Sequence, residues 1–475
     1  MFSLARPKTS ANTARPMLNY LWLALVTLAV LIGAATGRLA EVTSGAFTMA
    51  ETAVMKIALP LVGVMALWLG LMRLAERSGL VQVLARALRP MMKWLFPDVP
   101  ADHPAQGSML MNMAANMLGL SNAATPLGLR AMRDLESLNK TPGTATDAMV
   151  MFLAINTSSI QLIPATAIAI LAAQGSKDPT AIVGTALIAT TFSTIAGISA
   201  VKWLQNWRAF RATTDHAAMP SAAATAEPEA VALPEPAPLT GGGKATLALL
   251  GLAFAALFVW IVAAPQSYRD AASALHHAIF PANVAAPAAA DASATQNVLL
   301  RAIGTLSLMA VPLMLLFFPL YAALRRVKIY EEFIEGAKDG FGVATRVVPF
   351  LVAILVAIGM FRGAGGIEAM KSLLAPVLVP LGFPPDLLPL ALVRPLSGSA
   401  SLAMFSELVQ TTGADSLVSR MAGTIYGSTE TTFYVIAVYF GSVGIRRTRH
   451  AVAAGLFADF VGIVASVVIC RLMFG

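Results

Sequence analysis

Polar side chains gather in four stretches of an otherwise apolar chain, two in each half. The front half holds NMAANMLGLSNAATPLGLRAM, residues 112–132, and AINTSSIQLIPAT, residues 154–166. The back half holds RPLSGSASLAMFSEL, residues 394–408, and YGSTETTFYVIAVYFGSVGI, residues 426–445. Amide, hydroxyl and carboxylate groups at the depth of a bilayer are costly unless they face protein, water or a ligand. The four stretches therefore predict the walls of a site for a small polar solute.

The first stretch carries amides at helical spacing. Asn112 and Asn116 are four residues apart, so they fall on one face of a helix. Asn122 lies in a break that follows, and Thr125 with Pro126 predicts the cap and first position of a second helix. These side chains are candidates to bind a polar ligand. Hydrogen bonding between helices, which asparagine also supplies in membranes, is the alternative.

The second stretch is the most polar of the front half. Its candidate ligand-binding side chains are Asn156, Ser158, Ser159 and Gln161. Pro164 follows them, and a proline inside a helix frees a carbonyl group about one turn earlier. That carbonyl could meet a ligand or only a serine hydroxyl.

Arg394 opens the third stretch. It could pair with Glu407 or Glu430, or it could anchor the chain at the membrane surface. The candidate hydroxyls that follow it are Ser397, Ser399 and Ser401.

Glu430 is the acid on which we place most weight. It follows Ser428 and Thr429, and an apolar run begins directly after it. A buried carboxylate must be paired, protonated or bound to a cation, so Glu430 is a candidate ligand acceptor or proton carrier. For Asp459, in the last apolar run, a structural contact with a hydroxyl is the preferred interpretation.

Composition places the chain in a membrane. Of 475 residues, 57% are hydrophobic and 12% are charged, whereas soluble proteins have about 25% charged residues. The net charge of +8 comes from basic residues beside apolar runs, which is typical of cytoplasmic loops and does not indicate nucleic acid. We expect an all-α polytopic membrane protein that lies in the bilayer of the plasma (inner) membrane.

Signals for enzymatic chemistry are weak. The chain has no H-E-x-x-H, Walker or G-x-G-x-x-G motif, and no pair of nucleophile and base is apparent. Cys470 is the single cysteine, so no intramolecular disulfide and no cysteine metal cluster can form. We expect no catalytic residues, no metal site and no cofactor, apart from a proton or sodium ion that could couple to transport.

The order of features divides the chain into two similar halves. We expect a cytoplasmic N-terminus at 1–16, a first half at 17–210, a flexible Ala/Pro-rich linker at 211–243, two extra transmembrane helices with a polar loop at 244–329, and a second half at 330–475. The first apolar run could also be a signal peptide, but its length favours an uncleaved helix.

Basic residues predict how the two halves lie in the membrane. They place the N-terminus and the central linker in the cytoplasm and make matching helices run in opposite directions. Inverted repeats with interrupted helices are typical of secondary transporters, whose sites lie at the repeat interface. Glycines spaced four apart, at Gly336/Gly340 and Gly359/Gly363, permit close helix contact within one chain or in a homo-oligomer.

The polar stretches resemble a known family. NMAANMLGLSNAATPLGLRAM is similar to the signature of spore maturation protein A. SGSASLAMFSEL, GTIYGSTETTFYVIAVYFGSVGIRRTRHA and GLFADFVGIVAS are similar to spore maturation protein B. The resemblance covers most of both halves and indicates a fusion of the two proteins, which are separate and adjacent in many genomes.

The resemblance implies a fold and a site. The family belongs to the gate-domain, or nucleoside-recognition, superfamily, which is similar in part to concentrative nucleoside transporters. It implies two gate-type repeats and a nucleoside-like solute. Carried over by position, the implied site comprises Asn112, Asn116, Asn122, Thr125, Ser158, Ser159, Ser397, Ser399, Ser401, Ser428, Thr429 and Glu430.

Secondary transport is the preferred functional interpretation of these residues. A non-transporting scaffold or receptor in envelope or spore-cortex maturation is the alternative, since the resemblance links the separate proteins to dehydration of the spore core. A membrane-embedded enzyme is the least favoured interpretation, because the nucleophile and base it needs are not found.

Overall fold

The computed structural model describes residues 15–119, 121–158, 160–207, 210, 237–280, 297–380 and 382–475. Within these ranges the chain is helical, and the only extended pairing is an isolated bridge between Thr144 and Arg447. Residues 1–14 and 211–236, which hold most of the predicted N-terminal segment and linker, lie outside the described residues.

Six helices of the described part are long and apolar enough to cross a membrane. They are Leu39–Arg77, which comprises α2 (Leu39–Glu51), a π-helical segment (Thr52–Ala58) and α3 (Leu59–Arg77), then α9 (Ile182–Leu204), α10 (Gly241–Ala263), α12 (Val298–Leu324), α13 (Ile329–Gly363) and α19 (Ala451–Phe474). The first helix, α1 (Arg15–Thr36), contains a shorter apolar segment, Trp22–Thr36. The chain is thus a multi-pass membrane protein.

The remaining helices are shorter, and several are the two parts of an interrupted helix. In the front half they are α4 (Leu80–Leu95), α5 (Pro104–Met117), α6 (Ser121–Glu136), α7 (Asp147–Ser158) and α8 (Ala165–Ala173). In the back half they are α14 (Gly366–Leu378), α15 (Leu388–Val393), α16 (Gly398–Thr412), α17 (Leu417–Ser428) and α18 (Thr432–Ser442).

The two halves repeat the same order of elements. A long helix is followed by a tight turn at a glycine with positive φ, Gly79 (78°) or Gly365 (82°), and then by a shorter helix, α4 or α14. Two interrupted helices come next, α5–α6 and α7–α8 in front and α15–α16 and α17–α18 behind. Each half ends in a long apolar helix, α9 or α19.

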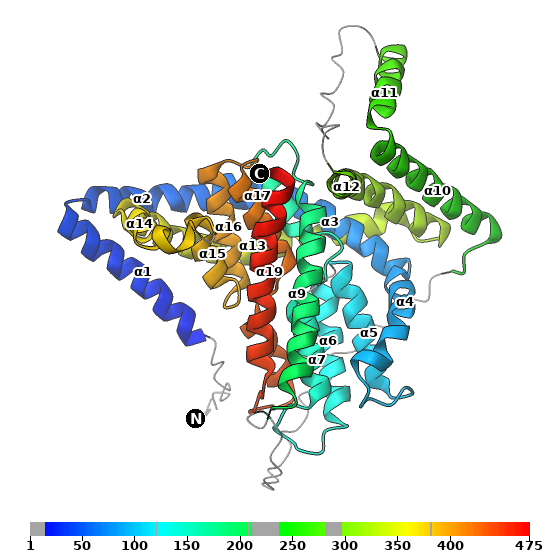
Figure 1. The fold of residues 1–475 in the computed structure, drawn as a ribbon, viewed down its shortest axis with the longest axis horizontal. Helices are drawn as coiled ribbons and strands as arrows, with labels where there is room; N and C mark the ends of the chain where they lie inside the picture. The colour runs from blue at the N-terminus through cyan, green and yellow to red at the C-terminus, as the bar shows by residue number, and fades with distance from the viewer. Residues whose placement is uncertain are drawn as a thin grey trace, which may run out of the picture.

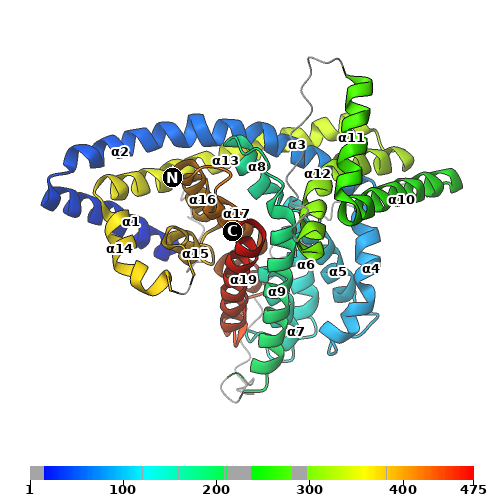
Figure 2. The same ribbon diagram turned by 45° about the horizontal axis from the view of Figure 1, so that its top comes forward.

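Matching helices run in opposite directions. The glycines of α13 pack against the backbone of α2–α3 so that Gly363 faces Glu41, whereas Gly340 faces Ala66. The residue numbers rise along one helix and fall along the other, and Figure 2 shows the two lying side by side. α9 and α19 are also antiparallel, because Ser193 contacts Gly462 and Gly197 contacts Ala458. The predicted inverted repeat is confirmed.

The two antiparallel pairs form the frame of the molecule. In Figure 1 the α9–α19 pair stands beside the interrupted helices, and the α2–α3 helix crosses it. The glycine contacts also show that the α2–α3 and α13 helices approach each other within one chain. The core lies where the interrupted helices meet the frame, and every residue of α7 from Met149 to Ser158 is buried.

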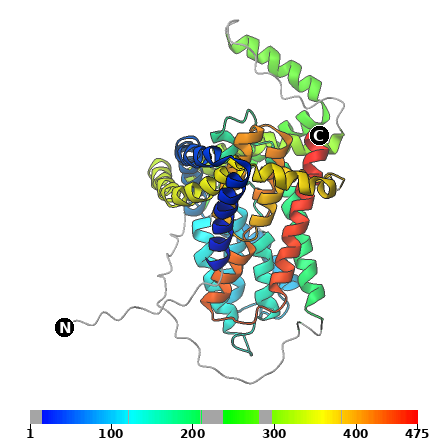
Figure 3. The same ribbon diagram turned by 90° about the vertical axis from the view of Figure 1, so that its left-hand side faces the viewer.

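The segment between the halves differs in part from its prediction. The two extra helices, α10 and α12, are present, but the region predicted as a polar loop contains α11 (Pro265–Ile279). No residue of α11 is buried, and this helix stands away from the rest of the molecule in Figure 3. Alanine favours helix wherever proline does not interrupt, and the stretch after Pro265 is free of proline until Pro281.

Candidate functional site

Three asparagines and a tyrosine form a buried hydrogen-bonded cluster between the halves. Asn116 Nδ2 donates to Asn156 Oδ1 at 2.8 Å and to Asn112 Oδ1 at 3.4 Å. The Tyr439 hydroxyl accepts from Asn112 Nδ2 at 3.3 Å and donates to Asn156 Oδ1 at 3.4 Å. Asn112 is fully buried and Asn156 is 5% exposed, whereas Asn116 is half-buried. We refer to these four residues as the amide cluster.

Local structure explains why the cluster forms. Asn112 and Asn116 lie on the same face of α5, as their spacing predicts, and Asn156 lies near the end of α7. Tyr439 reaches them from α18 because Gly128 leaves room, since a Cβ there would stand 2.2 Å from the Tyr439 hydroxyl. The cluster therefore joins both interrupted helices of the front half to one of the back half.

The breaks of the two halves bind each other through the backbone. α7 ends at Ser158 and α17 ends at Ser428, so the two interruptions occupy matching positions. We refer to the interruption after Ser158 as the front-half break and to the one after Ser428 as the back-half break. The Glu430 N–H donates to the Thr157 carbonyl at 2.9 Å. The Ser158 carbonyl accepts from the Thr190 hydroxyl of α9 at 2.7 Å. Backbone groups released by the interruptions are thus satisfied by other elements, as a bilayer demands.

Arg394 is a buried cation at the back-half break. Its guanidinium donates to the carbonyls of Tyr426, at 3.0 Å, and Thr429, and it lies 4.5 Å from the centre of the Tyr426 ring. The Thr431 hydroxyl accepts from it at 3.4 Å. Because its side chain is only 3% exposed, Arg394 is not a surface anchor.

Glu430 is the acid that lies beside Arg394. The two charged groups are 3.9 Å apart, and the Glu430 side chain is 37% exposed. The other predicted partner of Arg394, Glu407, instead pairs with Arg362. Glu430 therefore presents a carboxylate at the junction of the two breaks, where a ligand or proton could reach it.

Hydroxyl groups of the back half mainly serve local structure. Ser397 caps α16 by accepting from the Ala400 N–H at 3.2 Å, and it lies 3.4 Å from the Ser399 hydroxyl. Ser401 donates to the Ser397 carbonyl at 2.7 Å. In the break itself, Ser428 contacts Ser466 at 3.1 Å, and Thr429 donates to the Ile425 carbonyl at 3.0 Å.

The remaining candidates lie at the edge of this junction or outside the described residues. The Ser158 hydroxyl donates to the Ile155 carbonyl at 3.1 Å, while Gln161 and Thr125 are half-buried. Ser159 and the side chain of Asn122 fall outside the described residues, so their predicted roles remain predictions.

Two local predictions about proline are wrong. α6 begins at Ser121, not at Thr125, and Pro126 lies inside it. The chain breaks earlier, at Gly119 with φ of 76°, so the helix has already started when it reaches the proline. Pro164 precedes α8 rather than lying within a helix, so it frees no helical carbonyl near Ile160.

Sequence reasoning missed Tyr439. An aromatic residue in an apolar run is typical of a packed core, so the residue type did not indicate a polar contact. Its spacing from a polar residue was the only signal. It lies seven residues after Thr432, on the same face of α18 as the residue that begins the helix. Both side chains are buried and both make hydrogen bonds.

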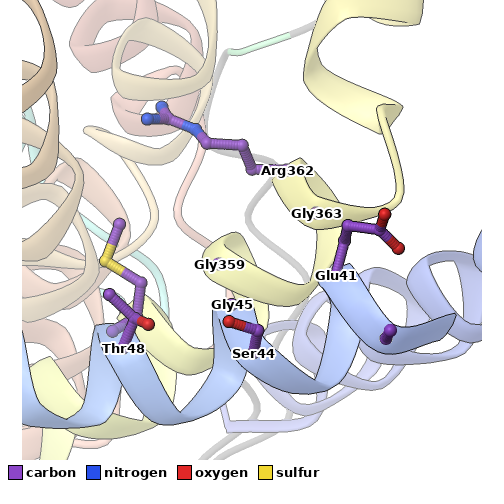
Figure 4. A pocket seen from close by; sticks show the side chains of 9 residues that line it. Glu41, Ser44, Gly45, Thr48, Gly359, Arg362 and Gly363 are labelled. Carbon is purple, nitrogen blue, oxygen red and sulfur yellow. The ribbon is translucent and has the colours of Figure 1, made fainter. Parts of the chain in front are cut away.

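A separate, open pocket lies beside the contact between α2 and α13. It has a volume of about 490 Å³ and is lined by Ala40, Glu41, Ser44, Gly45, Thr48, Met49, Gly359, Arg362 and Gly363. Figure 4 shows Arg362 extending away from Glu41, in keeping with its ion pair to Glu407. None of these residues belongs to the amide cluster or to the two breaks. Within the described residues, no group of three or more His, Cys, Asp or Glu side chains is arranged to hold a metal ion.

Two repeats with interrupted helices that meet at a polar junction define a membrane protein of the gate class. The family described as "Gate: Nucleoside recognition" matches residues 58–174 and 344–446, and each match includes the interrupted helices of one half. Spore maturation protein B of Bacillus subtilis (strain 168) is 43% identical over 173 residues, which are 36% of this chain and 97% of that protein. Spore maturation protein A of the same organism is 44% identical over 182 residues, 38% of this chain and 92% of that protein.

The chain belongs to the spore maturation protein family and joins counterparts of the A and B proteins in one polypeptide. A more distant similarity, 32% identity over 111 residues, is to the uncharacterized protein YjiH of Escherichia coli (strain K12). That match covers 23% of this chain and 47% of the other protein.

Proposed function

We propose that the chain is a secondary transporter of a small polar solute that binds where the two breaks meet. The observation that carries this proposal is the convergence of the amide cluster, the Glu430 carboxylate and the Arg394 guanidinium near the breaks that follow α7 and α17. Interrupted helices at matching positions of inverted repeats are where secondary transporters bind their substrates.

The chemistry of the junction favours a solute with several hydrogen-bonding groups. Amides offer both donors and acceptors, so the cluster could exchange its internal bonds for bonds to the donors and acceptors of a base or sugar. A nucleoside-like solute is further supported by the name of the matching family. The partly exposed Glu430 would bind a solute hydroxyl or carry the coupling proton or sodium ion.

A non-transporting scaffold or receptor is the second candidate. The amides of the cluster already have partners within the protein, since they bond to one another and Asn112 and Asn156 also donate to the carbonyls of Ala124 and Phe152. The pocket between α2 and α13 lies apart from them. A junction that stays closed in this way would tie the halves together without passing a solute. The names of the A and B relatives favour a role in maturation.

Ligand binding to the purified full-length chain is the first test. Thermal unfolding in detergent would be followed with uridine, cytidine, adenosine and inosine, because a ligand that binds the folded state raises the melting temperature. A nucleoside that raises it would then be tested for uptake into proteoliposomes. We expect Glu430→Gln to lose uptake while remaining folded, and Glu335→Gln, on the exposed start of α13, to behave as wild type.

The two candidates give different results. Normal uptake by Glu430→Gln would eliminate its coupling role. Absence of any shift and any uptake in wild type would reject the nucleoside transporter in favour of the scaffold, whose partner would then be sought by cross-linking.

A further inference from the structure

Asp459 is a buried acid that the proposed solute site does not use. It lies in the middle of α19, and it is 1% exposed. Its Oδ2 accepts from the Thr432 hydroxyl at 2.6 Å, whereas Oδ1 is buried without a hydrogen-bond partner among the described residues. One hydroxyl group is poor compensation for a carboxylate charge removed from water.

The surroundings of Asp459 connect it to the back-half break. Two glycines of α19 allow close packing on either side of the acid. A Cβ at Gly455 would lie 2.7 Å from Thr432, and a Cβ at Gly462 would lie 2.7 Å from Thr429. Asp459 therefore faces the segment that separates α17 from α18, and its hydrogen bond holds the first residue of α18.

Two charged side chains near the back-half break, Arg394 and Glu430, interact electrostatically with Asp459. The charged residues of the other helices packed on α19 lie at their far ends. On α7, Asp147 pairs with Arg449, and on α17, Arg420 lies over the Phe474 ring. Lys202 lies in the last turn of α9, over the Trp94 ring. No charged side chain of α18 lies among the residues Thr432–Ser442.

We propose that Asp459 is the proton-binding residue of the gate, neutral in the arrangement described here. Ionisation releases its proton to water and leaves a negative charge beside the break. That charge would compete for Arg394 with the carbonyls of Tyr426 and Thr429, and so would loosen the segment that Arg394 holds. The coupling role rests on the proposed transport function, but the protonation state of Asp459 does not.

Infrared spectroscopy of the full-length chain in deuterated buffer tests the protonation state without any solute. We expect the wild type at neutral pH to show a carbonyl band of a protonated carboxyl group that is lost in Asp459→Asn. The band should persist in Glu430→Gln and in Asp415→Asn, a matched control whose carboxylate binds Ser176 in a loop. Thr432→Val keeps the acid but removes its donor, so the band should shift and remain.

The outcomes separate this inference from the transport proposal. A carboxyl band that is absent in wild type, or unchanged in Asp459→Asn, would overturn the assignment of Asp459 as a proton-binding residue. If Asp459→Asn does not fold, an unshifted band in Thr432→Val would overturn it equally. Loss of the wild-type band when sodium chloride replaces choline chloride would also overturn it, in favour of a sodium site. A confirmed band together with no uptake would refute transport but leave the proton-binding residue in place.

Discussion

Replacing Arg394 tests whether this residue stabilises the back-half break through its hydrogen bonds to backbone carbonyls or through its ion pair with Glu430. In Arg394→Met the carbonyls of Tyr426 and Thr429 lose their donor. A buried carbonyl without a donor costs about 1–3 kcal/mol, which gives about 2–6 kcal/mol for the two. Because the substitution also removes the desolvation cost of the guanidinium, we expect a loss near the lower end, about 2 kcal/mol.

The ion pair with Glu430 should contribute little by comparison. Arg394 is buried, but the Glu430 carboxylate is 37% exposed and the charges are 3.9 Å apart, so water screens the pair and we expect it to contribute at most about 1 kcal/mol. The double variant Arg394→Met/Glu430→Gln should therefore be as unstable as the sum of the single variants, with a coupling energy below about 1 kcal/mol. Arg394→Lys should be intermediate, since one ammonium cannot span both carbonyls.

Unfolding by SDS in mixed micelles, followed by loss of helicity, would measure these differences. Arg446→Met, at an exposed position outside the junction, is the matched control and should be close to wild type. A coupling energy above about 1 kcal/mol would refute the reasoning. It would mean that Glu430, and not the backbone, is what Arg394 holds.

Two further predictions follow from packing and burial. In Gly340→Ala the new Cβ would lie 2.7 Å from the backbone of Ala66, and this overpacking should lower the free energy of unfolding by about 1–3 kcal/mol. The higher helix propensity of alanine should offset about 1 kcal/mol of that loss, and thermal unfolding in detergent would measure the net change. Gly63→Ala meets nothing within 4 Å and should be neutral or stabilising; equal effects of the two substitutions would contradict close helix packing. Burial, reinforced by Arg449, lowers the pKa of His450 to about 4. The unfolded chain then binds the extra proton, so stability should fall as pH drops from about 6.5 to about 4, and His450→Gln should remove that part of the pH dependence.

The sequence was sufficient to predict features that depend on composition and spacing. The spacing of Asn112 and Asn116 predicted that both lie on one face of one helix, and they do so on α5. The repeated order of features predicted that the halves match, and basic residues predicted that matching helices run in opposite directions. These inferences require only that polar groups and charges avoid the apolar part of a bilayer.

Features that depend on distant partners could not be predicted in the same way. Two acids, Glu407 and Glu430, were equally plausible partners of Arg394, and only the fold brings Arg362 to Glu407. Tyr439 joins the amide cluster because Gly128 is on a neighbouring helix, which no local pattern indicates. The start of α6 was missed because proline permits a helix start without requiring one.

The amide cluster and the contacts at the breaks hold the two halves together. The Thr157 carbonyl depends on Glu430 of the other half, and Asn112 depends on Tyr439. Similar bonds cross between the halves at the frame, where Ser193 donates to the Ala458 carbonyl at 2.9 Å. Each such bond in a membrane contributes only about 0.6 kcal/mol on average, so a stable junction requires many of them at once.

A covalent link helps such a junction form. When two weakly associating halves are joined, their encounter becomes intramolecular, with an effective concentration set by the length and stiffness of the connection. In Bacillus subtilis the similar A and B proteins are separate chains, each matching about a third of this one. In the fused chain the same polar contacts are made within one molecule, so a junction with few strong bonds can be retained even when the chain is dilute in the membrane.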